Sequence, residues 1–132
     1  MACWHLYSAT NHISLVEKDS LMSAKAMEVI KNEVETNPVV LYMKGTPDFP
    51  QCGFSARSAE ALKACGVTFK AVNVFDDEEI YRQGVKVYSN WPTIPQLFVS
   101  GELVGGSDII IDLFQSGELK TMLENASAGS DS

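Results

Sequence analysis

The sequence has little positive charge and no long apolar run. It carries 10 Lys and Arg against 17 Asp and Glu, which gives a net charge of −7 over 132 residues. Affinity for nucleic acid comes mainly from clustered Lys and Arg. No basic tract is present, so we expect no nucleic-acid partner. The longest apolar runs, such as Val39–Met43, are far shorter than the roughly 18 residues that a membrane-spanning helix needs, so no membrane span is predicted.

Cysteine is also scarce. Cys3, Cys52 and Cys65 are too few, and odd in number, for a small secreted domain held together by disulfides. This favours a reducing compartment. Residues 1–19 lack the basic start and apolar block of a secretory signal. They also lack Arg and contain acidic residues, which argues against a transit peptide in this stretch and leaves open one removed before it. We expect a flexible N-terminal arm.

The rest of the chain has the composition of one compact domain, with 45% hydrophobic and 20% charged residues. Apolar residues recur at helical spacing from Ser20 to about Thr36, with Asp19 or Ser20 as the N-cap. Residues 126–132 are small and polar, which predicts a disordered tail. We therefore place the domain at residues 20–125.

The order of the predicted elements indicates the fold class. Residues 39–43 form a continuous apolar run, as in a strand buried on both faces. A helix over residues 53–65 and a strand over 68–74 complete a βαβ unit. Two short runs, 96–99 and 102–104, predict a hairpin before a last helical stretch that Asp108 opens. This order predicts an α/β fold with a central four-stranded mixed sheet flanked by helices.

Cys52 is the residue to which the pattern assigns chemistry. It follows a central strand and begins a helix, where free backbone N–H groups and the helix dipole favour a thiolate. Lys44 adds a cationic neighbour. A second cysteine three residues later would form a local disulfide, but that position is Ser55. Cys65 lies roughly 20 Å away at about 1.5 Å per helical residue, and we expect it in the core.

A thiolate without a nearby partner has few uses. It reacts with an external thiol, or it binds a soft metal such as iron. Within the chain, Cys3 on the arm is the one candidate for a resolving cysteine. The alternative is that Cys52 is a small buried apolar residue. We assign His5 and His12, on the arm, no metal role.

Four stretches in the same order resemble motifs of the monothiol glutaredoxins of the Cys-Gly-Phe-Ser type. They are MKGTP (residues 43–47), PQCGFS (50–55), YSNWPTIPQL (88–97) and GELVGG (101–106). The resemblance spans about residues 24–125. It implies a thioredoxin-like fold, glutathione as ligand, and a bridging [2Fe-2S] cluster used in iron-sulfur assembly, with little disulfide reductase activity.

The resemblance also implies which residues bind glutathione. Lys44 and Arg82 match the positions that hold the glycine carboxylate, which their fixed charges suit. Ile94 matches the residue whose backbone pairs with the cysteinyl part, next to a cis bond to Pro95. Gly106 lets a peptide backbone approach closely.

The γ-glutamyl end of glutathione has its own two positions. Ser107 and Asp108 match the N–H groups at a helix start that bind its carboxylate, and the Asp108 carboxylate matches the partner of its ammonium. Without the resemblance, Asp108 is simply an N-cap, and both roles are open to it.

Two departures from the family pattern bear on these roles. Ser107 stands where many relatives have a cysteine, which excludes a disulfide with Cys52 there. Tyr81 looks like one extra residue between the acidic turn at 76–79 and Arg82, which leaves the direction of Arg82 less fixed.

A [2Fe-2S] cluster takes four thiolates, and this chain offers one well-placed sulfur. Two chains, each with Cys52 and one glutathione, supply four. We therefore expect a homodimer when the cluster is bound and a monomer otherwise. The alternative is an oxidoreductase that removes glutathione from proteins through Cys52 alone. A third reading is a thioredoxin-like adaptor with a vestigial thiol.

The resemblance makes a BolA-like partner and iron-sulfur recipient proteins the expected partners. It indicates the mitochondrion as the compartment, with the cytosol as the alternative.

Overall fold

The computed structural model describes the backbone of residues 15–130 and the side chains of residues 24–127. Most of the predicted arm, with Cys3, His5 and His12, lies outside the described residues. The elements follow one another along the chain as α2 (Leu15–Thr36), β1 (Val39–Met43), α3 (Gly53–Ala64), β2 (Lys70–Asn73), η1 (Glu78–Gln83), α4 (Gly84–Ser89), β3 (Gln96–Val99), β4 (Glu102–Gly105), α5 (Ser107–Ser116) and α6 (Glu118–Ser130).

The four strands form one mixed sheet in the order β2-β1-β3-β4. Strand β1 pairs in parallel with β2 and antiparallel with β3, which pairs antiparallel with β4. All five residues of β1 are buried, as the continuous apolar run predicted for a central strand. The predicted α/β fold with a four-stranded mixed sheet is confirmed.

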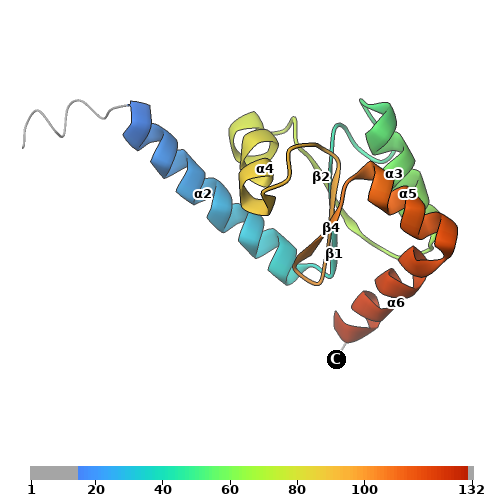
Figure 1. Ribbon diagram of the computed structural model, residues 1–132. Helices are drawn as coiled ribbons and strands as arrows, with labels where there is room; N and C mark the ends of the chain where they lie inside the picture. Colours follow the sequence, from blue (N-terminus) through green and yellow to red (C-terminus); the bar gives the residue numbers. More distant parts are fainter. Residues whose placement is uncertain (1–14, 131–132) are drawn as a thin grey trace, which may run out of the picture.

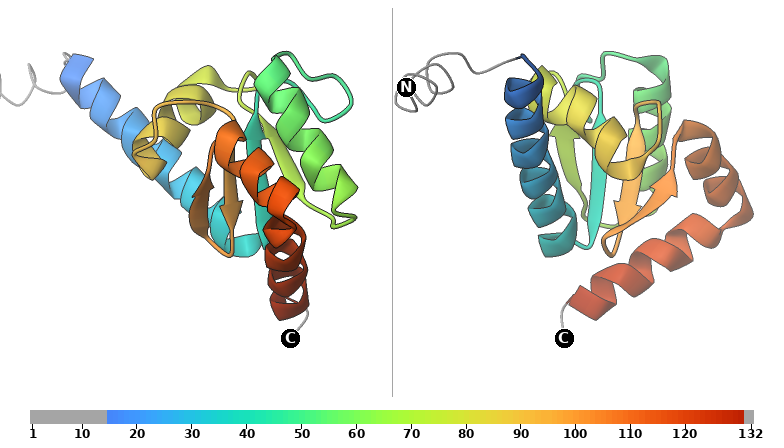
Figure 2. Two further views of the ribbon diagram at one scale, coloured as in Figure 1. Left: turned by 45° about the vertical axis from the view of Figure 1, so that its right-hand side comes forward. Right: turned by 60° about the vertical axis from the view of Figure 1, so that its left-hand side comes forward.

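Helices cover both faces of the sheet, as Figures 1 and 2 show. Successive side chains of a strand point to opposite faces, so β1 contributes to two cores. Val39, Leu41 and Met43 pack with α3, α5 and α6. Val40 and Tyr42 pack with α2, η1 and α4 on the other face. No helix among the described residues is long and apolar enough to cross a membrane.

Two helices extend beyond their predicted ends. Helix α2 begins at Leu15, five residues before the predicted start, so neither Asp19 nor Ser20 is its N-cap. Helix α6 runs to Ser130, into the segment predicted as a tail. Its apolar spacing continues past residue 125, because Ala126 is buried in the same core as Leu119 and Leu123, which favours continued helix.

A carboxylate ties α2 to the sheet and to η1. The Tyr42 hydroxyl donates to Glu33 Oε1 at 2.9 Å, and the Tyr81 hydroxyl donates to Glu33 Oε2 at 2.8 Å. Burial, together with the Glu33 carboxylate, raises the pKa of Tyr42. Burial and the hydrogen bond to Glu33 raise the pKa of Tyr81 to about 12.

The segment around Tyr81 is a π-helical turn. Asp77 caps it, since its side chain accepts a hydrogen bond from the N–H of Ile80 at 3.1 Å. A π-helix closes its hydrogen bonds five residues apart, so its turn holds one residue more than an α-helical turn. A turn of this kind has room for the extra residue that the resemblance suggests at Tyr81.

The tyrosine pair predicts a pH dependence of stability. Tyr81 has a raised pKa in the folded chain, so its contribution is complete below its unfolded value of 10.0 and is lost as the pH rises toward about 12. We expect Tyr81→Phe to lower the free energy of unfolding by about 1 kcal/mol at neutral pH. The deficit should shrink above pH 10. Urea titrations of both proteins at several pH values measure this, and parallel stability curves would contradict it.

Candidate functional site

Strand β1 ends in a tight turn that leads to Cys52. Gly45 has a φ of +91°, and a Cβ there would lie 2.5 Å from the Phe49 carbonyl oxygen and 2.7 Å from the Gln51 nitrogen. The turn therefore requires glycine. The Gln51 N–H donates to the Lys44 carbonyl at 2.9 Å, which returns the chain to the end of the strand just before Cys52.

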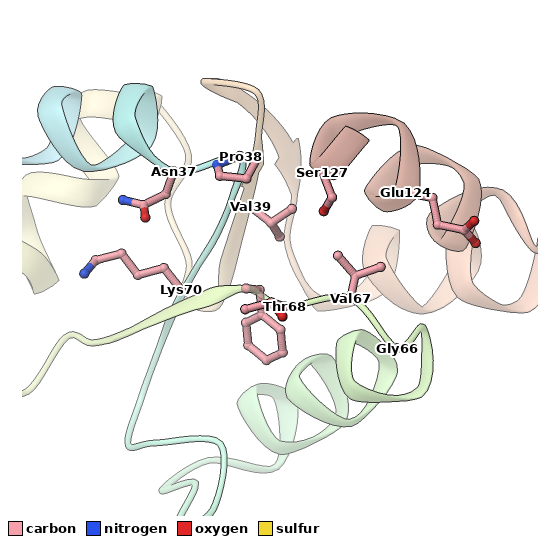
Figure 3. Close-up of a pocket in the computed structure, with 10 residues that line it drawn as sticks. Asn37, Pro38, Val39, Gly66, Val67, Thr68, Lys70, Glu124 and Ser127 are labelled. Carbon is pink, nitrogen blue, oxygen red and sulfur yellow. The ribbon is translucent and has the colours of Figure 1, made fainter. Parts of the chain in front are cut away.

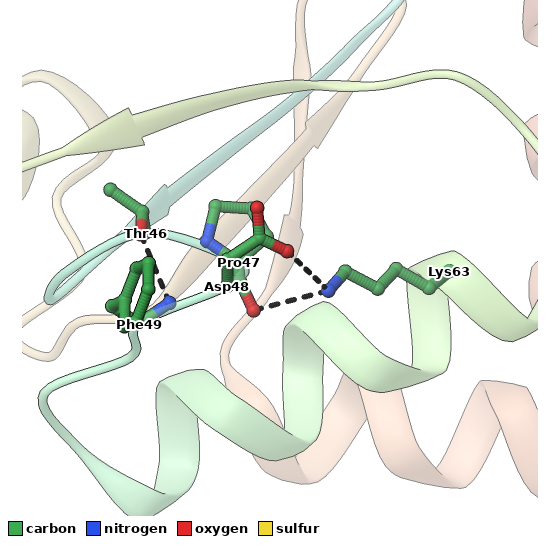
Figure 4. A network of polar contacts seen from close by, with 5 residues as sticks. All are labelled: Thr46, Pro47, Asp48, Phe49 and Lys63. Carbon is green, nitrogen blue, oxygen red and sulfur yellow. Dashed lines mark hydrogen bonds and ion pairs between the residues drawn. The ribbon is translucent and has the colours of Figure 1, made fainter.

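A lysine on the exposed side of α3 holds the loop before Cys52 against that helix. Lys63 Nζ donates to the Pro47 carbonyl at 3.1 Å and pairs with Asp48 Oδ1 at 3.4 Å, as Figure 4 shows. Thr46 Oγ1 accepts from the Phe49 N–H at 3.1 Å. These contacts are exposed, so each stabilises the chain only slightly. Together they define the path of the loop and leave the Phe49 ring 75% exposed.

Cys52 occupies the N-cap position of α3, as predicted, and is half-buried. Its thiol makes no capping hydrogen bond, so the first N–H groups of the helix are free to stabilise a charge on the sulfur. The pKa of the Cys52 thiol is lowered mainly by the Ser55 N–H. The Phe54 N–H, the Lys44 charge and the Ser55 hydroxyl lower it further, against an opposing effect of burial.

Ser55 does more than stand where a second cysteine is missing. Its side chain is fully buried, and its Oγ accepts a hydrogen bond from the Lys44 N–H at 3.0 Å. The same hydroxyl favours the Cys52 thiolate. One hydroxyl thus joins the end of β1 to the start of α3, which keeps Lys44 beside the sulfur.

A second loop meets the site from β3. The Ile94–Pro95 bond is cis, as the resemblance implied. Gln96 pairs with Tyr42 across the sheet, and continuing this antiparallel register places Ile94 opposite Lys44. The buried Gln96 side chain donates from Nε2 to the carbonyls of Trp91 and Thr93, at 3.0 and 2.9 Å. These bonds brace the loop that presents Ile94.

Gly106 packs against the same loop. A Cβ at Gly106 would lie 3.2 Å from Trp91 Nε1 and 3.5 Å from the Pro95 carbonyl oxygen. Strand β4 and the Ile94 loop therefore run close together, and the start of α5 follows at once. The sheet edge thus gathers the end of β1, the Ile94 loop and Gly106.

The start of α5 differs from the prediction in one respect. Its N-cap is Gly106, and Asp108 lies in the first turn, so Asp108 is not an N-cap. The reason is that Gly106 has extended backbone and its carbonyl already accepts the N–H of Ile110 at 3.0 Å. Ser107 and Asp108 line a cavity of about 360 Å³ between α3 and α5.

Arg82 lies in η1, where its Nη1 pairs with Glu78 Oε1 at 3.0 Å. Lys44 is the cation that acts on the Cys52 thiol. The Arg82 guanidinium has further N–H donors besides the one that pairs with Glu78, so the predicted role of Arg82 in holding a carboxylate stays open to it.

A larger cavity than the one beside Ser107 lies elsewhere. It measures about 690 Å³ and is lined by Val39 and Lys70, at the starts of β1 and β2, and by Glu124 of α6 (Figure 3). Cys52 follows the opposite end of β1. Among the described side chains, no group of three or more His, Cys, Asp or Glu is arranged to hold a metal ion. Cys65 is buried in the core, as predicted.

The family model described as Glutaredoxin matches residues 39–104. The chain belongs to the glutaredoxin family. Glutaredoxin 4 of Pasteurella multocida is 50% identical over 104 residues, which cover 79% of this chain and 94% of that protein. Monothiol glutaredoxin-5, mitochondrial, of Lachancea kluyveri is 48% identical over 122 residues, covering 90% of this chain and 85% of that protein. With Ser55 after Cys52, this glutaredoxin is of the monothiol type.

Solved structures confirm the thioredoxin-like fold. The solution structure of reduced poplar apo GrxS14 matches with a TM-score of 0.66 and 46% identity, over 76% of this chain and 92% of that one. The crystal structure of a buckwheat glutaredoxin–glutathione complex matches with a TM-score of 0.71 over 81% of this chain and 94% of that one. At 20% identity, the second likeness concerns the fold alone.

The sequence analysis of this glutaredoxin missed the buried or half-buried polar residues whose hydrogen bonds hold the segments around the site together. Ser55 was noticed only for the absence of a thiol, and Gln96 was counted as part of a strand. Asn73 was also missed; its Oδ1 accepts from the N–H groups of Gly45 and Phe75, at 3.1 and 2.9 Å. A polar residue inside an apolar run, as at Gln96, is the one signal that was present.

Replacing Ser55 by alanine should raise the pKa of the Cys52 thiol, because a hydroxyl that stabilises the thiolate is removed. It should also cost about 1–3 kcal/mol of unfolding free energy, since the Lys44 N–H loses its acceptor. The pH dependence of the rate of alkylation by iodoacetamide measures the first effect, and urea denaturation the second.

Ser58→Ala is the matched control. Ser58 is equally buried on the same helix, but its hydroxyl donates to the Phe54 carbonyl at 2.9 Å. We expect an unchanged alkylation midpoint for Ser58→Ala. The same midpoint in Ser55→Ala as in the unmodified chain would refute the assigned role of the Ser55 hydroxyl.

Proposed function

We propose that this monothiol glutaredoxin binds a [2Fe-2S] cluster together with glutathione and transfers it during iron-sulfur cluster assembly. The observation that carries the proposal is the state of Cys52: a half-buried sulfur with a lowered pKa and Ser55 in place of a resolving cysteine. A thiolate is the form in which cysteine binds iron. Such a sulfur is suited to a ligand that arrives from solution and leaves again.

The surroundings of Cys52 support glutathione as that ligand. Glutathione carries two carboxylates and one ammonium, so its site needs positive charge or N–H groups at two places and a carboxylate at a third. Lys44 and Arg82 would take the glycine carboxylate. The backbone of Ile94 would pair with the cysteinyl part. Membership of the glutaredoxin family supports this choice.

The other end of the tripeptide would lie at α5. The first N–H groups of a helix attract a carboxylate, so those of Ser107 and Asp108 would bind the γ-glutamyl carboxylate. The exposed Asp108 side chain would pair with the ammonium. Gly106 would contribute by letting the loop that presents Ile94 lie close to the start of α5, because a Cβ there would lie 3.2 Å from Trp91 Nε1.

Four sulfurs are needed for the cluster, and each chain would supply one from Cys52. Two chains and two glutathiones complete the set, so the cluster-bound form would be a homodimer and the cluster-free form a monomer. Half of the ligands would then be dissociable small molecules, which favours delivery of the cluster to a recipient. The cluster is cargo in this scheme.

Replacement of Cys52 by serine should abolish cluster binding. After anaerobic reconstitution with iron, sulfide and glutathione, we expect the unmodified chain to show visible absorption and two irons per dimer, because each thiolate is needed. Cys52→Ser should remain colourless. Omitting glutathione should have the same effect on the unmodified chain.

Cys65→Ala is the control, since Cys65 is buried in the core and should not matter for the cluster. A coloured Cys52→Ser protein with a full iron count would overturn the proposal. Colour without glutathione would overturn the part that assigns the tripeptide as a ligand.

A second function has support in the same observation. A stabilised, partly exposed thiolate also attacks mixed disulfides, so the chain would remove glutathione from modified proteins through Cys52 alone. The sulfur of Cys52 would bond to the glutathione sulfur and release the protein thiolate; a second glutathione would then attack and leave as glutathione disulfide. We expect slow turnover of a glutathionylated peptide at best. Turnover comparable to that of a dithiol glutaredoxin would make this the main activity.

The remaining assignments are part of the same proposal. A BolA-like partner and iron-sulfur recipient proteins fit a carrier. The mitochondrion fits the relative from Lachancea kluyveri, whose name includes it, while bacterial relatives such as Glutaredoxin 4 of Pasteurella multocida keep the cytosol as the alternative. The domain limits at residues 20 and 125 and a resolving role of Cys3 remain predictions.

A further inference from the structure

The cavity beside the site is lined by two helices. One wall consists of Ser107, Asp108, Ile111 and Asp112 of α5. The other consists of Phe54 and Arg57 of α3, and the proposed glutathione contacts do not use it. Arg57 is therefore on the helix that Cys52 caps, and it faces the segment that would bind the γ-glutamyl end. The cavity joins the thiol end of α3 to the first turn of α5.

The charged groups around this cavity are not paired with one another. Among the described side chains, the ion pairs are Lys63 with Asp48 and Arg82 with Glu78. Arg57 thus enters no ion pair, although two carboxylates, Asp108 and Asp112, line the same cavity. One unpaired cation opposite unpaired carboxylates matches a ligand that carries a negative and a positive group on the same carbon.

The free end of a γ-glutamyl group is such a ligand, since its α-carbon bears an ammonium and a carboxylate. We propose that Arg57 is a further binding residue that contacts the γ-glutamyl α-carboxylate and makes the site selective for an unblocked γ-glutamyl end. This rests on the proposed binding of glutathione. The carboxylate would lie between the Arg57 guanidinium and the N–H groups of α5, and the ammonium would face Asp108.

The chemistry of the side chains favours this assignment. A guanidinium is planar and presents two parallel N–H donors to a carboxylate, while the helix N–H groups take its remaining lone pairs. The apolar walls, Phe54 and Ile111, exclude part of the water from the contact. Phe54 is nevertheless 57% exposed, so the charge pair stays partly hydrated and its strength modest.

The test is an NMR chemical-shift titration of the reduced full chain, which also measures weak dissociation constants. We expect Arg57→Gln to bind glutathione about fivefold more weakly, within the range for a partly exposed charge pair. Arg57→Lys should recover part of the loss. Lys70→Gln is the matched control, because it removes one positive charge at the cavity of about 690 Å³ beside the start of β2, and should bind as the unmodified chain does.

A glutathione analogue whose γ-glutamyl α-carboxylate is an amide identifies the group that Arg57 contacts. Arg57→Gln and the unmodified chain should bind this analogue equally, because the partner of Arg57 is gone. Equal binding of glutathione by the two proteins, or an equal loss for both ligands, would overturn the role of Arg57 and leave the proposed function standing. Failure of the unmodified chain to bind glutathione would instead overturn the proposed function.

Discussion

The stabilisation of negative charge on one sulfur by the start of α3 is the interaction on which the site depends. Cys52 caps that helix, and the N–H of Ser55 does most to lower its pKa. The effect requires the helix to begin at this residue. The turn at Gly45, where no larger residue fits, brings the chain back to the end of β1 just before it. The buried sheet behind the site keeps β1 and α3 at a fixed distance, so the charge is stabilised without help from a ligand.

The two faces of the sheet contribute differently to this arrangement. The face covered by α3, α5 and α6 is apolar, and it carries the helix starts that the site uses. The opposite face contains the Glu33 carboxylate between two tyrosine hydroxyls, which joins α2 to the π-helical turn. Hydrogen bonds to a charged group are stronger than neutral ones. The π-helical turn is thus anchored at Tyr81.

Much of this was predictable because local signals and packing agree. The apolar run of β1 and the helical spacing that ends at about Thr36 give correct ends, and Ser100 and Gly101 adopt the positive φ angles that a tight hairpin turn requires. The start of α2 at Leu15 and the end of α6 at Ser130 differ from the predicted limits, and helix ends are the part of an element that sequence patterns fix least well. The supporting bonds of Ser55, Asn73 and Gln96 escaped prediction because each joins segments that the topology alone brings together.

Serine at position 55 removes a resolving thiol, but it adds a hydroxyl that supports the site. A hydroxyl donates strongly and accepts at the same time, whereas a thiol is weak in both roles. At this buried position the Ser55 oxygen accepts from the Lys44 N–H and also favours the Cys52 thiolate. A cysteine in its place would offer a resolving thiol but would hold Lys44 less firmly and leave the thiolate less stabilised. The chain therefore lacks an internal route to a disulfide at this position and keeps a hydroxyl that favours the thiolate, and both consequences direct Cys52 toward partners from solution.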